Sequence, residues 1–196
     1  MTLNLQNSVN FKPHIRWMAS TSSWKKSTDD GTIDVQIPLA IFDLENIKTG
    51  WAIFAEGEAP EWVLDPNLIE QAPKPDDGRP WKRGFNCLVY SENYLGGARE
   101  FATTATGACR AISSLHDEYL IQAGNNPGMV PVVKYNGATP TQIGKGHTNV
   151  PILTIEKWVA RPDALKNGAD NPPTSEQADT SGPWDEALST EPDDEF

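Results

Sequence analysis

The clearest regular pattern in the chain is an alternation of apolar and polar residues over residues 32–44. A period of two predicts a β-strand with one face turned to a core. That face carries Ile33, Val35, Ile37, Leu39 and Ile41. Pro38 cannot donate a hydrogen bond to a neighbouring strand, so we expect a sheet edge or a bulge there. Residues 47–56 predict a second strand, and the short joint between the two runs favours a β-hairpin.

Residues 58–83 interrupt this regularity, because five prolines fall within them. Prolines at this density exclude a central strand and a long helix, so we expect a long loop. Long loops in compact domains are usually functional or disordered. Residues 20–31 are also predicted to be a loop, because turn-forming residues dominate them. Apolar residues predict a strand, or the start of one, at residues 14–19 and a further strand at residues 84–92.

The period changes between residues 97 and 122. Six residues recur there at spacings of four and three, which predicts one face of an amphipathic helix: Phe101, Ala105, Ala108, Ile112, Leu115 and Tyr119. The two alanines let this helix lie close to a sheet. Strands are predicted again at residues 129–135 and 149–160, and Asn136-Gly137 marks a turn after the first of them.

The main elements therefore run in the order three strands, one helix and two strands. A five-stranded β-barrel with its helix between the third and fourth strands has the topology of the OB fold. Other small β-barrels and α+β sheets share this order, so the order favours the OB fold without singling it out. We expect one domain over residues 1–162 and a separate segment over residues 163–196.

Charge separates these two parts of the chain. The 196 residues contain 16 basic and 27 acidic residues, for a net charge of −11. Nine of the acidic residues and none of the basic ones follow residue 167, so residues 1–167 carry −2 and the remainder carries −9. A segment this acidic and this poor in apolar residues is expected to be disordered. The nearly neutral body can still present a basic surface, because the distribution of charge matters more than its sum.

Several classes of protein are disfavoured by what the sequence lacks. The two cysteines, Cys87 and Cys109, have no CxxC spacing, which argues against a zinc site or a disulfide framework and for a reducing compartment, the cytoplasm. His14, His116 and His147 are isolated and form no metal-binding motif. We find no signal peptide, membrane span, phosphate-binding loop or catalytic motif. We therefore expect no enzymatic activity, no cofactor and no membrane association.

Aromatic residues with cationic neighbours recur along the chain. Single-stranded nucleic acid needs both kinds of side chain, because phosphates bind in a cationic groove and bases stack on flat rings. The predicted nucleic-acid-binding residues are Trp24, Lys25, Lys26, Trp51, Trp81, Lys82, Arg83, Phe85, Tyr90, Lys134 and Tyr135. Seven tryptophans cannot all be exposed, and we expect Trp17 and Trp51 to be half-buried or more. The alternative for the others is ordinary packing in the core.

The C-terminal segment completes a resemblance. An OB-type body followed by an acidic, lysine-free tail that ends in Asp193-Asp194-Glu195-Phe196 resembles the single-stranded DNA-binding proteins. Bacterial members end in acidic residues followed by Ile-Pro-Phe, whereas here the acidic residues run straight into Phe196, as in some bacteriophage members. The resemblance covers the tail and the order of elements only.

This resemblance implies a two-part mechanism. The body coats single-stranded DNA without sequence preference during phage replication, recombination and repair, in the cytoplasm of the host. The tail recruits replication and recombination proteins, with Phe196 in an apolar pocket and Asp193, Asp194 and Glu195 facing a basic rim; Trp184 is a second anchor. The oligomeric state stays open, a homo-oligomer included.

Two other hypotheses compete with this one. The first is a non-enzymatic β-barrel interaction protein or virion-structural protein whose acidic tail only confers solubility. It predicts no DNA binding and no effect of losing Phe196. The second, an enzyme on a β-rich scaffold, is weaker because no catalytic constellation is visible in the sequence.

Overall fold

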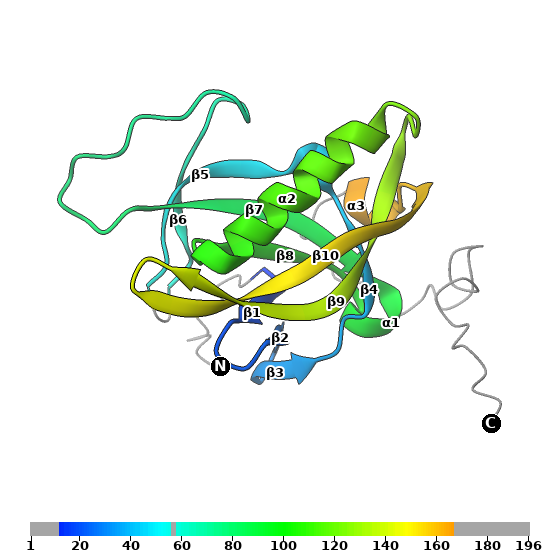
Figure 1. Cartoon of the computed structure of the whole chain (residues 1–196), viewed down its shortest axis with the longest axis horizontal. Helices are drawn as coiled ribbons and strands as arrows, with labels where there is room; N and C mark the ends of the chain where they lie inside the picture. Colours follow the sequence, from blue (N-terminus) through cyan, green and yellow to red (C-terminus); the bar gives the residue numbers. More distant parts are fainter. Residues whose placement is uncertain (1–11, 56–57, 167–196) are drawn as a thin grey trace, which may run out of the picture.

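The computed structural model describes residues 12–55 and 58–166. It is mainly β, with ten strands and three helices (Figure 1). The strands are β1 His14–Met18, β2 Ser23–Thr28, β3 Gly31–Val35, β4 Leu39–Phe42, β5 Lys48–Ile53, β6 Glu61–Leu64, β7 Lys82–Ser91, β8 Gly97–Thr103, β9 Met129–Ile143 and β10 Gly146–Ala160. The helices are α1 Glu92–Leu95, α2 Thr106–Ala123 and α3 Asp163–Lys166, and a 3₁₀ turn covers Leu44–Asn46.

All ten strands join one open, mixed sheet. Its main path runs β10-β9-β4-β7-β8-β1-β2-β3, and β5 and β6 branch from it through β7. The pair β1–β8 is parallel and the other pairs are antiparallel. Strand β7 is central, because it pairs with β8 on one side and with both β4 and β5 on the other. The sheet is therefore more extensive than the predicted set of five strands, although it is mainly β and places its long helix before the last two strands, as expected.

Two hydrophobic clusters lie in the fold. The larger one includes residues of α2 together with four rings that contact one another, Trp17, Trp24, Phe101 and Tyr135. The smaller one includes Ile41, Tyr90, Val130, Val132 and Leu165. Strand β7 contributes to both, because its successive side chains point to opposite faces.

The long alternating run at residues 32–44 forms two strands rather than one. β3 ends at Val35 and β4 begins at Leu39, with Pro38 in the break, as its missing N–H requires. The predicted hairpin to the next strand is wrong, because β4 and β5 do not pair with each other. The 3₁₀ turn between them redirects the chain, so that β4 and β5 each pair with a different stretch of β7.

The helix begins later than the period suggests. Phe101 lies in β8, and α2 starts at Thr106, so the stripe that packs in the core is Ala108, Ile112 and Leu115. Phe101 matched the helical spacing only because a buried strand residue happened to precede the helix by the right interval. Among the described residues, none of α1, α2 and α3 combines the length and the apolar character of a membrane-spanning helix.

Three segments predicted to be turns or loops also contain strand residues. Asn136-Gly137 does not end β9, which continues to Ile143. Between the pairs Tyr135–Leu153 and Ala138–Pro151, two residues of β9 face one residue of β10, which defines a β-bulge. Gly137 adopts a φ of 85° there, a conformation that glycine tolerates. The predicted loop at residues 20–31 holds β2, and the predicted loop at residues 58–83 holds β6.

Candidate nucleic-acid interface

Strands β5, β6 and β7 bring an indole and two cations together. Trp51 of β5 lies directly opposite Val63 of β6 and Arg83 of β7. Directly opposed side chains share one face of a sheet, and the Arg83 guanidinium carbon lies 5.3 Å from the centre of the Trp51 ring. Lys74 belongs to the connection between β6 and β7, residues 65–81, and its Nζ lies 5.7 Å from the same ring. The half-buried indole therefore makes two cation–π contacts.

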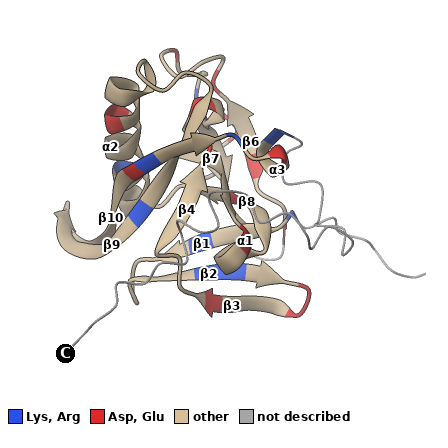
Figure 2. Ribbon diagram, turned by 90° about the vertical axis from the view of Figure 1, so that its right-hand side faces the viewer, with Lys and Arg blue, Asp and Glu red and all other residues tan. Residues whose placement is uncertain are grey.

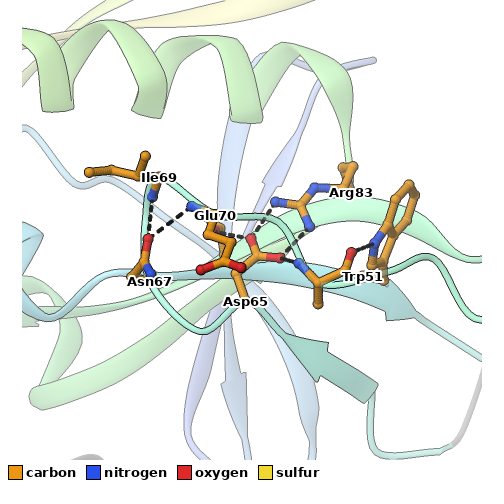
Figure 3. Close-up of polar contacts among 8 residues, drawn as sticks. Trp51, Asp65, Asn67, Ile69, Glu70 and Arg83 are labelled. Carbon is orange, nitrogen blue, oxygen red and sulfur yellow. Dashed lines mark hydrogen bonds and ion pairs between the residues drawn. The ribbon is translucent and has the colours of Figure 1, made fainter.

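The connection between β6 and β7, here called the 65–81 loop, is anchored by Asp65. Its carboxylate is buried, with a side chain 2 % exposed. It accepts hydrogen bonds from the Thr49 hydroxyl, from both terminal nitrogens of Arg83 and from the backbone N–H of Ala72 (Figure 3). The hydrogen bond from Arg83 holds the pKa of Asp65 well below its ordinary value and outweighs the opposing effect of burial. Asp65 is therefore ionised at neutral pH.

A second bond fixes the same point of the loop. The carbonyl oxygen of Ala72 accepts a hydrogen bond of 2.9 Å from Nε1 of Trp51. Both backbone polar groups of Ala72 are thus held, one by Asp65 and one by Trp51. Residues 66–71 form a closed loop between the two anchored positions.

The far half of the 65–81 loop has its own anchor. Arg79 contacts Asp77 through Nε at 2.8 Å and both carboxylate oxygens of Glu61 on β6 at 2.8 Å. The hydrogen bond from Arg79 lowers the pKa of Asp77 to about 2. Trp81 is buried, donates from Nε1 to Asp77 at 2.9 Å and packs against the Arg79 guanidinium. The loop is therefore held to the rest of the fold by specific side-chain contacts, although it contains no regular secondary structure.

Four of the predicted base-stacking rings belong to the core. Trp24, Trp81, Phe85 and Tyr90 are 3, 6, 3 and 9 % exposed. This corrects the expectation that they lie open to bases, since a buried ring offers no face for stacking. The loop around Trp24 is in fact β2, and alternation along that strand turns the ring inward. Tyr135 is also largely packed, and its hydroxyl donates to the carbonyl of Ser22.

The predicted cations lie on three different strands, β2, β7 and β9 (Figure 2). Lys25 forms an ion pair with Asp34 at 3.3 Å. Lys26 donates to the carbonyl of Tyr94 at 3.1 Å. Lys82 and Lys134 are exposed and, within the described residues, form no ion pair. The predicted site residues that the structure brings together are therefore Trp51 and Arg83, with Lys82 next to Arg83 in the chain but on the opposite face of β7.

Three features of the 65–81 loop were not predicted from the sequence. Lys74 has only its position between Pro73 and Pro75 as a signal, because two prolines fix the backbone around one exposed cation. Asp65 looked like an ordinary acidic loop residue, because its partner Arg83 lies 18 positions away. The exposed Ile69 carried no signal at all.

The predicted partner-binding residues, Trp184, Asp193, Asp194, Glu195 and Phe196, lie outside the described residues. Within residues 12–55 and 58–166, no group of three or more His, Cys, Asp or Glu side chains is placed to hold a metal ion. No protein-family model, no curated protein and no solved structure matches this chain.

Proposed function

We propose that this protein binds single-stranded DNA without sequence preference, as a phage-type single-stranded DNA-binding protein. The observation that carries the proposal is the half-buried indole of Trp51, held against Lys74 and Arg83 on β5–β7. An aromatic face beside cations is the combination that a single strand requires, since the base stacks and the phosphates are attracted. The anchored 65–81 loop keeps this arrangement in place before any ligand arrives.

One exposed cation beside the indole, Lys74, supports the proposal. The positive charge of Arg83 is balanced by the carboxylate of Asp65, so Arg83 positions the indole rather than adding net positive charge to the site. Lys48, Lys74 and Lys82 are exposed on β5, the loop and β7, and within the described residues none of them forms an ion pair. Of these, Lys74 is the exposed lysine beside Trp51, whereas Lys48 and Lys82 lie on the opposite face of β5 and β7.

The OB fold remains part of the proposal rather than a finding. The chain places α2 after the strands β7 and β8 and before the long antiparallel pair β9–β10. This order corresponds to the helix position of an OB barrel, within a larger and open sheet. In the proposal the acidic segment that carries Phe196 recruits replication and recombination proteins, as the sequence resemblance implies.

Lys74→Glu in the full chain is expected to weaken binding of oligo-dT about tenfold at low salt, and to make the dependence of log K on log [salt] shallower by about one unit. The physical reason is that the substitution removes one phosphate-attracting cation and places a negative charge beside the stacking ring. Fluorescence anisotropy of a labelled oligonucleotide at several salt concentrations measures both quantities.

Lys145→Glu is the matched control, because Lys145 is an exposed lysine at the turn between β9 and β10 and the charge change is identical. Its effect is expected to be clearly smaller. Equal losses in both variants would indicate that only net charge matters, and an unmodified chain with no affinity for oligo-dT at low salt would refute the proposed function.

Removing residues 168–196 takes away nine negative charges and is expected to leave the affinity for single-stranded DNA unchanged or to raise it, most strongly at low salt. Recruitment of partner proteins is expected to be lost. The same titrations, run on full and shortened chains, measure the first effect.

Phe196→Ala in the full chain serves as the control, because it keeps every charge. It is expected to leave DNA binding as it is and to weaken partner recruitment. A shortened chain that binds DNA more weakly than the full chain would contradict the assignment of separate roles to body and tail.

A second candidate function is supported by one surface feature. Leu120 and Ile121 at the end of α2 are 61 and 80 % exposed, and Met129 at the start of β9 is also exposed. Exposed apolar side chains of this kind favour the alternative of an interaction or virion-structural protein. This alternative predicts no affinity for oligo-dT and no effect of Phe196→Ala on any interaction.

A further inference from the structure

The closed loop at residues 66–71 presents an isoleucine to solvent. Ile69 is 96 % exposed, the highest value of any large apolar side chain among the described residues, and its neighbour Leu68 is 47 % exposed. Figure 3 shows the Ile69 side chain pointing away from the Asp65 carboxylate. An apolar side chain held this far out of the protein contributes nothing to the core and is available for contact with a ligand.

Hydrogen bonds define the shape of this loop. The side-chain oxygen of Asn67 accepts from the backbone N–H groups of Ile69 at 2.9 Å and of Glu70 at 2.8 Å. The two ends are held at Asp65 and Ala72. Ile69 is therefore displayed by a constrained backbone, whose ends are held by the buried Asp65 carboxylate.

The loop rises from the proposed DNA-binding platform. Its anchor Ala72 bonds to Trp51, and Lys74 follows two residues later. Ala72 lies three residue steps after Ile69, and at about 3.5 Å per step the tip lies within roughly 10 Å of that anchor. This reach corresponds to about three steps of a stacked strand at about 3.4 Å per step.

The charged side chains near the tip favour contact with one part of a DNA strand, its bases or its phosphates, over the other. Glu70 is exposed beside Ile69 and repels phosphates, whereas Lys74 at the root attracts them. A strand whose phosphates lie near Lys74 can place its bases against the apolar tip. Branched apolar side chains inserted between base steps are a known way to unstack nucleic acid.

We propose that Ile69 inserts between adjacent bases of the bound single strand and unstacks them. This inference rests on the proposed DNA-binding function and adds a base-contacting residue to it. Leu68 flanks the inserted side chain, and the Asp65–Arg83 pair positions the loop. The protein then straightens and separates bases as it coats the strand.

The experiment compares full-length Ile69→Ser with full-length Ile121→Ser. Both isoleucines are highly exposed, so neither substitution removes core packing, and Ile121 lies on α2. The probe is an oligodeoxyadenylate that carries one 2-aminopurine, whose fluorescence rises when the base is unstacked. Protein is added to saturation, and affinities are measured separately by anisotropy.

The unmodified chain and Ile121→Ser are expected to raise the 2-aminopurine fluorescence, and Ile69→Ser is expected to lose most of that rise. Its affinity is expected to fall about tenfold, since burial of the side chain against bases is lost. Ile69→Ser with unchanged fluorescence and affinity would overturn the insertion, while DNA binding itself would stand; an apolar pocket on a protein would then be the better partner. An equal loss in Ile121→Ser also overturns it. No binding by the unmodified chain refutes the proposed function itself.

Discussion

Asp65→Ala is expected to lower the free energy of unfolding by about 3 kcal/mol and to release the 65–81 loop. The carboxylate is buried and accepts hydrogen bonds from Thr49, Arg83 and Ala72, all of which lose their acceptor. Removing one partner of a buried ion pair can cost more, but the Arg83 side chain is 32 % exposed and recovers part of its hydration. Chemical denaturation measures the stability, and limited proteolysis within residues 66–80 reports the loop.

The same substitution is expected to weaken DNA binding, because Trp51 loses its partner at Ala72 and Lys74 loses its fixed position. Asp76→Ala is the matched control, since Asp76 is an exposed acidic residue of the same loop. It is expected to change neither stability nor proteolysis noticeably. Equal behaviour of the two variants would contradict the anchoring role of Asp65.

The stabilisation by Asp65 depends on pH in a defined direction. Because its pKa is lower in the folded than in the unfolded chain, its contribution is fully present above about pH 4 and is lost as the pH falls below that value. The stability difference between the unmodified chain and Asp65→Ala should therefore shrink on acidification. A difference that grows as the pH falls would contradict this assignment.

Arg161→Met is expected to destabilise the body by about 3–5 kcal/mol, because it leaves the buried charge of Asp43 without its cation. Asp43 is 1 % exposed and lies 2.8 Å from Nη1 of Arg161. It keeps two hydrogen bonds from the Asn46 side chain, at 3.1 and 3.0 Å, but these do not neutralise it. Arg161 also pairs with Glu45, so the residue ties the end of β10 to the 3₁₀ turn.

Lys166→Met is the control for this measurement. Lys166 forms an ion pair with Asp163, but both side chains are largely exposed, and such pairs contribute little. Denaturant titrations of the two variants are expected to differ widely in midpoint. If Arg161→Met unfolded at the same denaturant concentration as Lys166→Met, the buried pair would not support the fold as argued.

Sequence patterns were reliable where the cause of a structure is local. The stripe of Ala108, Ile112 and Leu115 predicted α2, since a helix repeats its core contacts every three to four residues. Alternation predicted strands along β7, β9 and β10. At Pro38 the sequence predicted an irregularity, an edge or a bulge, within one strand, whereas the structure has a break between two strands, β3 and β4. Phe101 was assigned to the helix by the same rule, because a spacing can match two periods by coincidence.

The candidate site was predicted less completely. Trp51 and Arg83 were named from the sequence, but their contact was not, because strand register places them opposite each other. A lysine next to an aromatic residue in the sequence did not show that the aromatic ring is exposed. In a strand, neighbouring residues point to opposite faces, so Trp24 enters the core while Lys25 remains on the surface.

The sequence by itself determined the mainly β character, the long helix, the irregular proline-rich connection and the separation of a nearly neutral body from an acidic segment of −9. These properties depend on composition and short-range periodicity. Only the tertiary structure decided which tryptophan lies half-exposed beside cations, which carboxylate anchors the loop and where Ile69 points. Those features depend on pairing between strands and on contacts such as Asp65 with Arg83, which join residues far apart in the chain and leave no periodic trace in it.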